Sequence, residues 1–399
     1  MKFVYISPEF PKSNWQFCDR LKRNGVTVLG IGQERYENLD QTLREALTEY
    51  YKVNNLEDYD EMLRAVAFFT FKYGKLDFLE SNNEYWLEKD ARLRTDFNIP
   101  HGFHVSNIEP VKSKSLMKEY FAKAGVPCAR GEVVTTLESA LAFANKVGYP
   151  LVVKPDKGVG AAKTYKLSAP PDVEKWFQQK DGDTYLLEEY LDGEVVTYDA
   201  IINSRGEPIF DISLECPVSI MTMVNDGVDC VFYSCPEPIP ELKPLGLKVV
   251  EAFGIKSRFV HLEFFRLNRD HPGLAPKGAY LALEVNMRPA GGFSPDMYNY
   301  ARSEDVFQIW ADMVAFDKTA SVPQGPSNYC ISASRHDEYR YVRTHQEIMD
   351  TYRDRLALCT RMPDVEARVM GNTVYLAKVA TKEEIDEFVN FVTQQAPAT

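Results

Sequence analysis

Apolar and polar side chains alternate along residues 280–288, and this pattern predicts a β-strand with two different faces. The face expected in the core carries Leu281, Leu283, Val285 and Met287. The opposite face presents Glu284, Asn286 and Arg288, at steps of about 6–7 Å because side chains on one face recur every two residues. A carboxylate and an amide oxygen suit a hard cation such as Mg²⁺, and a guanidinium suits a phosphate. A strand whose polar face simply contacts water is the alternative.

The first hundred residues alternate between strand-like and helix-like patterns. We expect strands over residues 3–7, 26–31, 51–54 and 76–80, and helices over 14–24, 39–50, 58–73 and 84–96. This order is typical of a small doubly wound α/β unit. Ser7–Pro11 occupies the turn where a dinucleotide-binding unit would carry G-x-G-x-x-G, so the pattern disfavours dinucleotide binding.

The remaining chain begins with two helices and becomes rich in strands from about residue 149. Helices are expected over 113–124, 136–147, 171–179, 245–253, 306–316 and 382–391. Strands are expected over 149–155, 165–167, 184–191, 194–202, 208–214, 258–267, 279–288, 328–335, 365–370 and 373–379, with a loop-rich segment at 215–242. We therefore divide the chain into an α/β domain (1–110), a central domain (111–325, with subdomains 111–190 and 191–325) and a C-terminal α+β subdomain (326–399).

Composition narrows the class of protein and its partners. The formal charge of −12 disfavours nucleic acid and anionic membranes as main partners. No apolar run is long enough to span a bilayer. Seven scattered cysteines, together with an N-terminus that lacks the apolar core of a signal peptide, predict a cytoplasmic protein with reduced thiols.

Lys154 lies at the end of a buried-strand pattern, directly before a turn of small residues at 156–164. A buried lysine without an anionic partner is costly, so this position predicts a nearby anion. Gly158 and Gly160 would let backbone N–H groups approach phosphate oxygens closely. The turn lacks the pattern of a P-loop, G-x-x-x-x-G-K-[ST]. A plain hairpin with a surface lysine is the alternative.

Three further carboxylates, Glu188, Glu189 and Glu194, lie close together in sequence. On a strand, Glu188 and Glu189 point to opposite faces, so one would face inward and could accept from an exocyclic amine such as that of adenine. Glu194 could bind a ribose diol. The alternative is an exposed acidic edge.

The strand expected over 258–267 repeats the alternation of the strand at 280–288, with His261 and Glu263 on one face. If the two strands pair, Glu263 and Glu284 can lie side by side, and adjacent carboxylates repel unless a cation or a proton lies between them. Such a pair is more specific evidence for a metal site than either carboxylate alone. His261 is read as either a structural histidine or a substrate contact.

Together these patterns resemble the ATP-grasp superfamily of carboxylate–amine ligases over roughly residues 1–320. The most specific piece is Glu284–Gly292, which is similar to the E-x-N-x-R-P-x-G-G signature of the L-amino-acid (dipeptide) ligase branch. The resemblance implies an ATP-grasp fold, and an ATP- and Mg²⁺-dependent enzyme that joins a small-molecule carboxylate to an amine through an acyl phosphate. It names Mn²⁺ as an alternative metal, and homodimers are common in this superfamily.

The resemblance also implies a role for each candidate residue. Phosphate ligands would be Lys114 (with Lys112 the less favoured match) and Lys154, under a lid turn containing Gly158, Gly160 and Ala161. The nucleoside would be held by Glu188, Glu189, Tyr190, Leu191 and, at the ribose, Glu194. The metal ligands would be Glu263, Glu284 and Asn286. Arg288 would meet the γ-phosphate and the acyl phosphate, while His261 stands where some relatives carry an arginine.

Two other functions stay open at this point. One is a different ATP-grasp reaction, of the carboxyphosphate or carbamoyl-phosphate type, although we find no glutaminase domain, biotinyl-lysine motif or duplicated half. The other is a nucleotide-binding regulatory protein without turnover. The complete set of Glu263, Glu284, Asn286 and Arg288 argues against the second function, because a protein without catalysis would not need all four.

Overall fold

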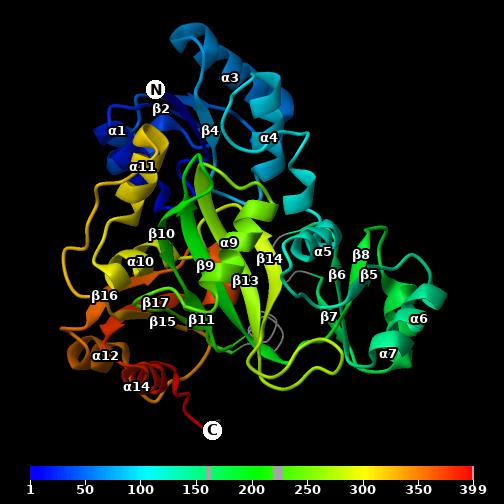
Figure 1. Cartoon of the computed structure of the whole chain (residues 1–399). Helices are drawn as coiled ribbons and strands as arrows, with labels where there is room; N and C mark the ends of the chain where they lie inside the picture. Colours follow the sequence, from blue (N-terminus) through cyan, green and yellow to red (C-terminus); the bar gives the residue numbers. More distant parts are fainter. Residues whose placement is uncertain (159–162, 219–227, 398–399) are drawn as a thin grey trace.

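The computed structural model describes residues 1–158, 163–218 and 228–397, and their strands form three sheets. In Figure 1 the N-terminal sheet lies at the top, the largest sheet runs through the centre, and a small sheet lies on the right. The α/β and α+β class expected from the sequence is confirmed. No helix among the described residues is long and apolar enough to cross a membrane.

The N-terminal unit is a four-stranded parallel sheet of order β3-β2-β1-β4. Its strands are β1 (Lys2–Ile6), β2 (Thr27–Gly32), β3 (Glu49–Lys52) and β4 (Phe78–Glu80). Its helices are α1 (Asn14–Arg23), α2 (Gln41–Ala46), α3 (Tyr59–Tyr73) and α4 (Leu87–Asp96), with a 3₁₀ turn η1 (Tyr36–Asn38). The doubly wound unit predicted from the alternating pattern is therefore confirmed, and its parallel strands all end at one edge of the sheet.

The small sheet is antiparallel and has the order β5-β8-β6-β7. Its strands are β5 (Gly131–Val133), β6 (Leu151–Pro155), β7 (Tyr165–Leu167) and β8 (Tyr185–Glu189). Helices α6 (Leu137–Val147) and α7 (Pro170–Gln179) pack on it through a separate apolar cluster. The 3₁₀ turn η2 (Glu109–Val111) and helix α5 (Lys114–Lys123) lead into this unit from the N-terminal one.

The central sheet has nine antiparallel strands, ordered β14-β13-β9-β11-β12-β15-β17-β16, with β10 also paired to β9. The strands are β9 (Gly193–Ile202), β10 (Pro208–Ile212), β11 (Leu214–Cys216), β12 (Val231–Ser234), β13 (Arg258–Leu267), β14 (Tyr280–Asn286), β15 (Tyr329–Arg335), β16 (Leu356–Arg361) and β17 (Thr373–Val379). The C-terminal strands thus extend the same sheet that contains β13 and β14.

The helices of the central and C-terminal parts are α9 (Lys243–Ala252), α10 (Ser294–Arg302), α11 (Val306–Phe316), α12 (His345–Thr351), α13 (Asp364–Met370) and α14 (Lys382–Thr393). Helix α11 lies between the N-terminal and central sheets. Trp310 on α11 contacts Phe3 of β1 and Phe17 of α1 at ring-centroid distances of 5.5 and 4.9 Å. A single apolar cluster therefore joins the two units.

The strand predicted at 365–370 is wrong, because those residues belong to helix α13. The alternation there resembles a strand, but Asp364 and Glu366 in the first turn and Arg368 in the last turn suit the helix dipole. Strand β17 instead pairs with β15 on one side and β16 on the other, and the pattern missed β16 because its side chains are half-exposed on both faces. Helix α10 was also missed, and strand β12 lies inside the segment expected to be loop-rich.

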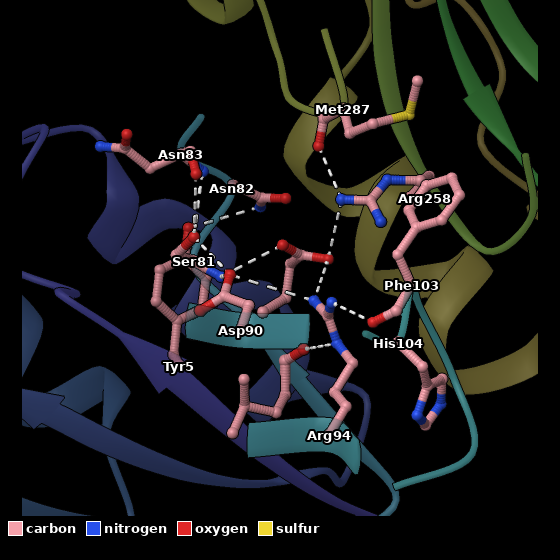
Figure 2. Close-up of polar contacts among 12 residues, drawn as sticks. Tyr5, Ser81, Asn82, Asn83, Asp90, Arg94, Phe103, His104, Arg258 and Met287 are labelled. Atoms are coloured by element: carbon pink, nitrogen blue, oxygen red, sulfur yellow. Dashed lines mark hydrogen bonds and ion pairs between the residues drawn. The ribbon is translucent and has the colours of Figure 1, made fainter. Parts of the chain in front are cut away.

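A buried cluster of charges joins the N-terminal unit to the end of β14 (Figure 2). Arg94 of α4 is fully buried and donates to Glu80 (2.9 Å) and to the carbonyl of Leu79 (2.8 Å). Arg258 of β13 donates both to Glu80 (3.1 Å) and to the carbonyl of Met287 (2.7 Å). One carboxylate therefore links two arginines from units far apart in the sequence.

We predict that Arg94→Met lowers the free energy of unfolding by about 3 kcal/mol, because buried Glu80 loses one of its two arginines and buried Asp90 loses the arginine that lies 3.9 Å away. Urea denaturation followed by circular dichroism measures the change. The matched control is Arg353→Met, which removes an exposed arginine paired with Asp350 and should change stability by less than about 0.5 kcal/mol. Equal effects of the two substitutions would contradict a structural role for the cluster.

Candidate functional site

Polar side chains form two rows across three neighbouring strands of the central sheet. One row pairs Asp199 of β9 with His261 of β13 and Asn286 of β14. The second row pairs Thr197 with Glu263 and Glu284. The expected pairing of the two carboxylate-bearing strands is confirmed, with Glu263 opposite Glu284. The rows arise because every second residue of an antiparallel strand faces the same side.

His261 connects the two rows. Its Nδ1 lies 2.5 Å from Asp199, and its Nε2 lies 3.1 Å from Glu263, whose carboxylate also accepts from Asn286 (3.4 Å). Burial alone would lower the pKa of His261, but the two carboxylates raise it to about 9. Burial would raise the pKa of Glu263, but the bond and charge of His261 lower it. A protonated His261 thus keeps Glu263 ionised and orients its carboxylate.

Lys114 is held at the start of α5 by the segment that follows β6. Asp156 accepts from the Ser113 hydroxyl (2.8 Å) and from the Ser115 N–H (2.8 Å), while its carbonyl accepts from the Lys114 N–H (2.9 Å). The Lys114 ammonium lies 3.1 Å from Glu284 and donates to the carbonyl of Gly158 (3.2 Å). Asp156 therefore anchors the start of α5 beside β6, the strand that carries Lys154.

Lys154 is buried and lies 2.6 Å from Glu188, which also contacts Lys118. Burial would raise the pKa of Glu188, but the two lysines lower it to about 2. For Lys154, burial lowers the pKa, and Glu188 with Glu284 raises it by a larger amount. The anion that the sequence predicted beside Lys154 is present as Glu188, and both groups are charged at neutral pH.

These residues surround a cavity of about 500 Å³ between the small sheet and the central sheet. The candidate residues that line it are Lys114, Lys154, Gly158, Glu188, Glu189, Tyr190, Leu191, Glu194, Glu263, Glu284, Asn286 and Arg288. His261 lies behind Glu263 rather than on the cavity wall. Gly160 and Ala161 lie outside the described residues.

Besides Glu188, two more of the expected nucleoside ligands already have partners. The Glu189 carboxylate accepts from the backbone N–H of Arg130 (2.7 Å) and from its guanidinium (2.5 Å). Glu194 is bound by Arg266 (2.6 Å), whose guanidinium also contacts Glu215 (2.7 Å). Glu194 still lines the cavity and is partly exposed, so its second carboxylate oxygen can reach a ligand there.

Arg288 occupies the boundary between this cavity and a second, larger one of about 960 Å³. Within the described part of the chain its guanidinium makes one hydrogen bond, to the carbonyl of Pro289 (2.8 Å). The neighbouring Met287 is held from both sides, since its N–H donates to Glu84 (3.4 Å) and its carbonyl accepts from Arg258 (2.7 Å). The backbone before Arg288 is therefore fixed while the guanidinium retains donors for an anion.

The oxygen donors present fit one hard divalent cation. Glu263 and Glu284 are adjacent carboxylates, and Asn286 adds an amide oxygen two residues along. Burial and the charge of Glu263 raise the pKa of Glu284 despite the nearby Lys114, as expected for two carboxylates without a cation between them. Among the residues described, no three His, Cys, Asp or Glu gather as a metal-binding group, so the amide would complete the set.

Several residues that hold the candidate ligands in place were not predicted from the sequence. Lys118 lies one helical turn after Lys114, and that i,i+4 spacing could have revealed it. Asp199 is a carboxylate inside an apolar strand, a signal of the kind that singled out Glu263. Asp156, Glu84 and Arg258 carry no such signal. Their roles depend on contacts between segments distant in the sequence.

A family model and a curated protein are similar to parts of this chain. A family model described as "Phosphoribosylglycinamide synthetase, ATP-grasp (A) domain" matches residues 112–212. Alanine–anticapsin ligase of Bacillus subtilis (strain 168) is 23% identical over 280 residues, which cover 62% of this chain and 56% of that protein. The chain thus spans about half the length of this curated relative.

Solved structures resemble the whole chain. The crystal structure of L-amino acid ligase from Bacillus licheniformis has a TM-score of 0.71 at 15% identity, covering 100% of this chain and 99% of that one. The biotin carboxylase domain of 2-oxoglutarate carboxylase from Hydrogenobacter thermophilus, solved with MgADP, ADP and bicarbonate, has a TM-score of 0.70 at 15% identity, covering 100% and 90%. At these identities the likeness establishes the fold.

We predict that Lys154→Met weakens MgATP binding at least tenfold, because a buried charge-assisted contact to phosphate is worth about 1.5–3 kcal/mol. Isothermal titration calorimetry with a non-hydrolysable ATP analogue measures the affinity. Lys277→Met removes an exposed lysine that does not line the cavity and serves as the control with unchanged affinity. Equal affinities for the wild-type and Lys154→Met proteins would count against a phosphate role for Lys154.

Proposed function

We propose that this chain, which has the ATP-grasp fold, is an ATP- and Mg²⁺-dependent carboxylate–amine ligase acting on amino-acid-like substrates. The observation that carries the proposal is the register of β13 and β14. It places Glu263 opposite Glu284 and beside Asn286, with Arg288 at the opening between two cavities. Charge-neutralising, phosphate-binding and substrate-activating groups therefore face one volume.

In the proposed first step, an oxygen of the substrate carboxylate attacks the γ-phosphorus of ATP. The bond from the γ-phosphorus to the β,γ-bridging oxygen breaks, and ADP leaves. Lys114 and Lys154 balance the phosphate charge from the side of the small sheet. A Mg²⁺ ion held by Glu263, Glu284 and Asn286 would neutralise charge on the β- and γ-phosphate oxygens.

In the proposed second step, an amine nitrogen attacks the acyl carbon and the bond from that carbon to the phosphate oxygen breaks. Inorganic phosphate leaves and takes up the proton that the nitrogen loses. Arg288 can donate to the oxygens of the acyl phosphate, because its guanidinium faces both cavities and has no carboxylate within ion-pair distance among the described residues. Catalysis then depends on positioning and on fixed charges. We assign His261 to positioning Glu263, since it does not line the cavity.

The remaining parts of the proposal concern metal choice, assembly and location. We infer that Mn²⁺ can replace Mg²⁺, because carboxylate and amide oxygens suit both ions. A cytoplasmic location is supported by seven cysteines that are all free thiols. A homodimer is proposed from resemblance alone, and size-exclusion chromatography with light scattering tests it.

We predict that wild-type protein with MgATP releases ADP only when an amino acid is added, and that mass spectrometry detects an amide product. Glu284→Gln should reduce ADP release at least 10³-fold with an unchanged circular dichroism spectrum, because it removes one of the two metal-binding charges. Glu207→Gln, at an exposed position, is the control. Full carboxylate-dependent ADP release by Glu284→Gln would refute the metal assignment. ADP release with bicarbonate but no amino acid would instead indicate a carboxyphosphate-forming reaction.

Asp199→Asn should raise the Mg²⁺ concentration needed for half-maximal activity by about 10–100-fold, because it removes the charge that keeps His261 protonated against Glu263. At saturating Mg²⁺ the substitution should restore most of kcat, a result that a simple folding defect would not give. Asp350→Asn, an exposed aspartate, is the control. An unchanged Mg²⁺ dependence would show that Asp199 does not position the metal ligand.

A further inference from the structure

The second cavity, of about 960 Å³, lies where the parallel strands of the N-terminal unit end. Ser7, Gln33, Asn54 and Asn82 follow β1 to β4 in turn, and all four line it. The opposite wall is the segment 288–292, so Arg288 belongs to both cavities. In an open α/β sheet, ligands bind at the carboxyl ends of the strands. A molecule in the second cavity would therefore meet Arg288 from the side opposite the first cavity.

The lining of this cavity is acidic. Among its described residues the carboxylates are Glu9, Glu34, Glu84 and Glu366, and the only basic side chain is Arg288. Glu84 is neutralised by Lys112 at 2.9 Å. Within the described chain, Glu9, Glu34 and Glu366 have no lysine or arginine within ion-pair distance. Glu34 is exposed and accepts from the Asn38 amide (2.8 Å) and from the Arg35 N–H (2.9 Å), whereas Glu9 and Glu366 are partly buried. The described lining therefore carries three carboxylates without an ion-pair partner and one guanidinium.

Glu9 is held in place by its surroundings. Its Oε1 accepts from the Gln33 N–H (2.8 Å), while its Oε2 is buried and has no partner. A Cβ at Gly32 would lie 2.3–2.4 Å from the two carboxylate oxygens and 2.5 Å from the Tyr50 hydroxyl, so a larger residue there would force Glu9 out of this position. Burial raises the pKa of Glu9, as expected for a carboxylate without a cation beside it. Because Glu9 lines the cavity, its unpaired oxygen is an acceptor that a donor on a bound molecule would satisfy.

We propose that the second cavity binds the carboxylate substrate, and that this substrate is an amino acid with a cationic side chain. Its carboxylate would lie at Arg288, and its ammonium or guanidinium group would donate to Glu9 and Glu34. An amino acid with a neutral side chain carries one cationic group, its α-ammonium, whereas the described lining carries three carboxylates without an ion-pair partner, so a second cationic group improves the charge balance. This inference rests on the proposed ligase function only for the reaction that follows binding.

The experiment compares pairs of amino acids that differ in the charge of the side chain. Arginine with citrulline, and lysine with norleucine, are titrated into the 399-residue chain with a non-hydrolysable ATP analogue and Mg²⁺, by isothermal titration calorimetry. We expect arginine and lysine to bind at least tenfold more tightly than their neutral counterparts. Glu9→Gln should weaken the binding of arginine about tenfold and leave citrulline unchanged. Glu37→Gln, an exposed carboxylate outside the cavity lining, is the matched control.

A second variant tests the position of the carboxylate rather than its charge. Gly32→Ala should reproduce the loss of arginine affinity, because the added Cβ would displace Glu9. Equal affinity for arginine and citrulline, or equal losses for both in Glu9→Gln, would overturn the proposal. Because binding is measured without turnover, charge-selective binding without carboxylate-dependent ADP release would refute the ligase function alone. ADP release without charge selectivity would refute only this inference.

Discussion

The backbone N–H and carbonyl of Met287 are bound by two buried charged side chains, and the geometry of the candidate site depends on these two contacts. Glu84, paired with Lys112, accepts from its N–H, and Arg258, paired with Glu80, donates to its carbonyl. Figure 2 shows the Arg258 side of this arrangement, where Arg94 completes the cluster. Because charges buried together are costly to separate, the N-terminal unit and the end of β14 keep one relative position. Arg288 is the next residue, so the start of its backbone is held in a fixed place.

Ion pairs and hydrogen bonds also fix the side chains on the other side of the first cavity. Asp156 binds the start of α5, which brings Lys114 next to the strand that carries Lys154. Lys118 and Lys154 hold Glu188, while Asp199 and Glu263 hold His261. In the free protein these ammonium and imidazolium groups balance carboxylates. A bound nucleotide and metal would replace some of these partners. The protein groups would already be charged and oriented, which reduces the reorganisation that catalysis requires.

Much of the fold could be predicted because its elements have strong periodicity. The parallel N-terminal unit, the pairing of β13 with β14 and the helix beginning at Lys114 all follow from apolar spacing and turn residues. The errors fall where local pattern and tertiary context disagree. Residues 365–370 alternate like a strand, yet their capping charges favour a helix, and the true edge strand β16 is too exposed to show a clear pattern.

Sequence alone determined most of the residues that can carry the chemistry, since strand periodicity puts Glu284 and Asn286 on one face and Glu263 on the face of a like strand. Arg288 lies beyond the end of β14 at Asn286, so strand periodicity does not place it. The sequence also determined that Lys154 needs an anion. Only the tertiary structure decided which anion that is, which residues hold the Met287 peptide, and that Arg288 opens into a second, acidic cavity beside Glu9. The reason is physical. Periodicity reports which way a side chain points along its own element, whereas partners from other elements depend on how the sheets and helices pack.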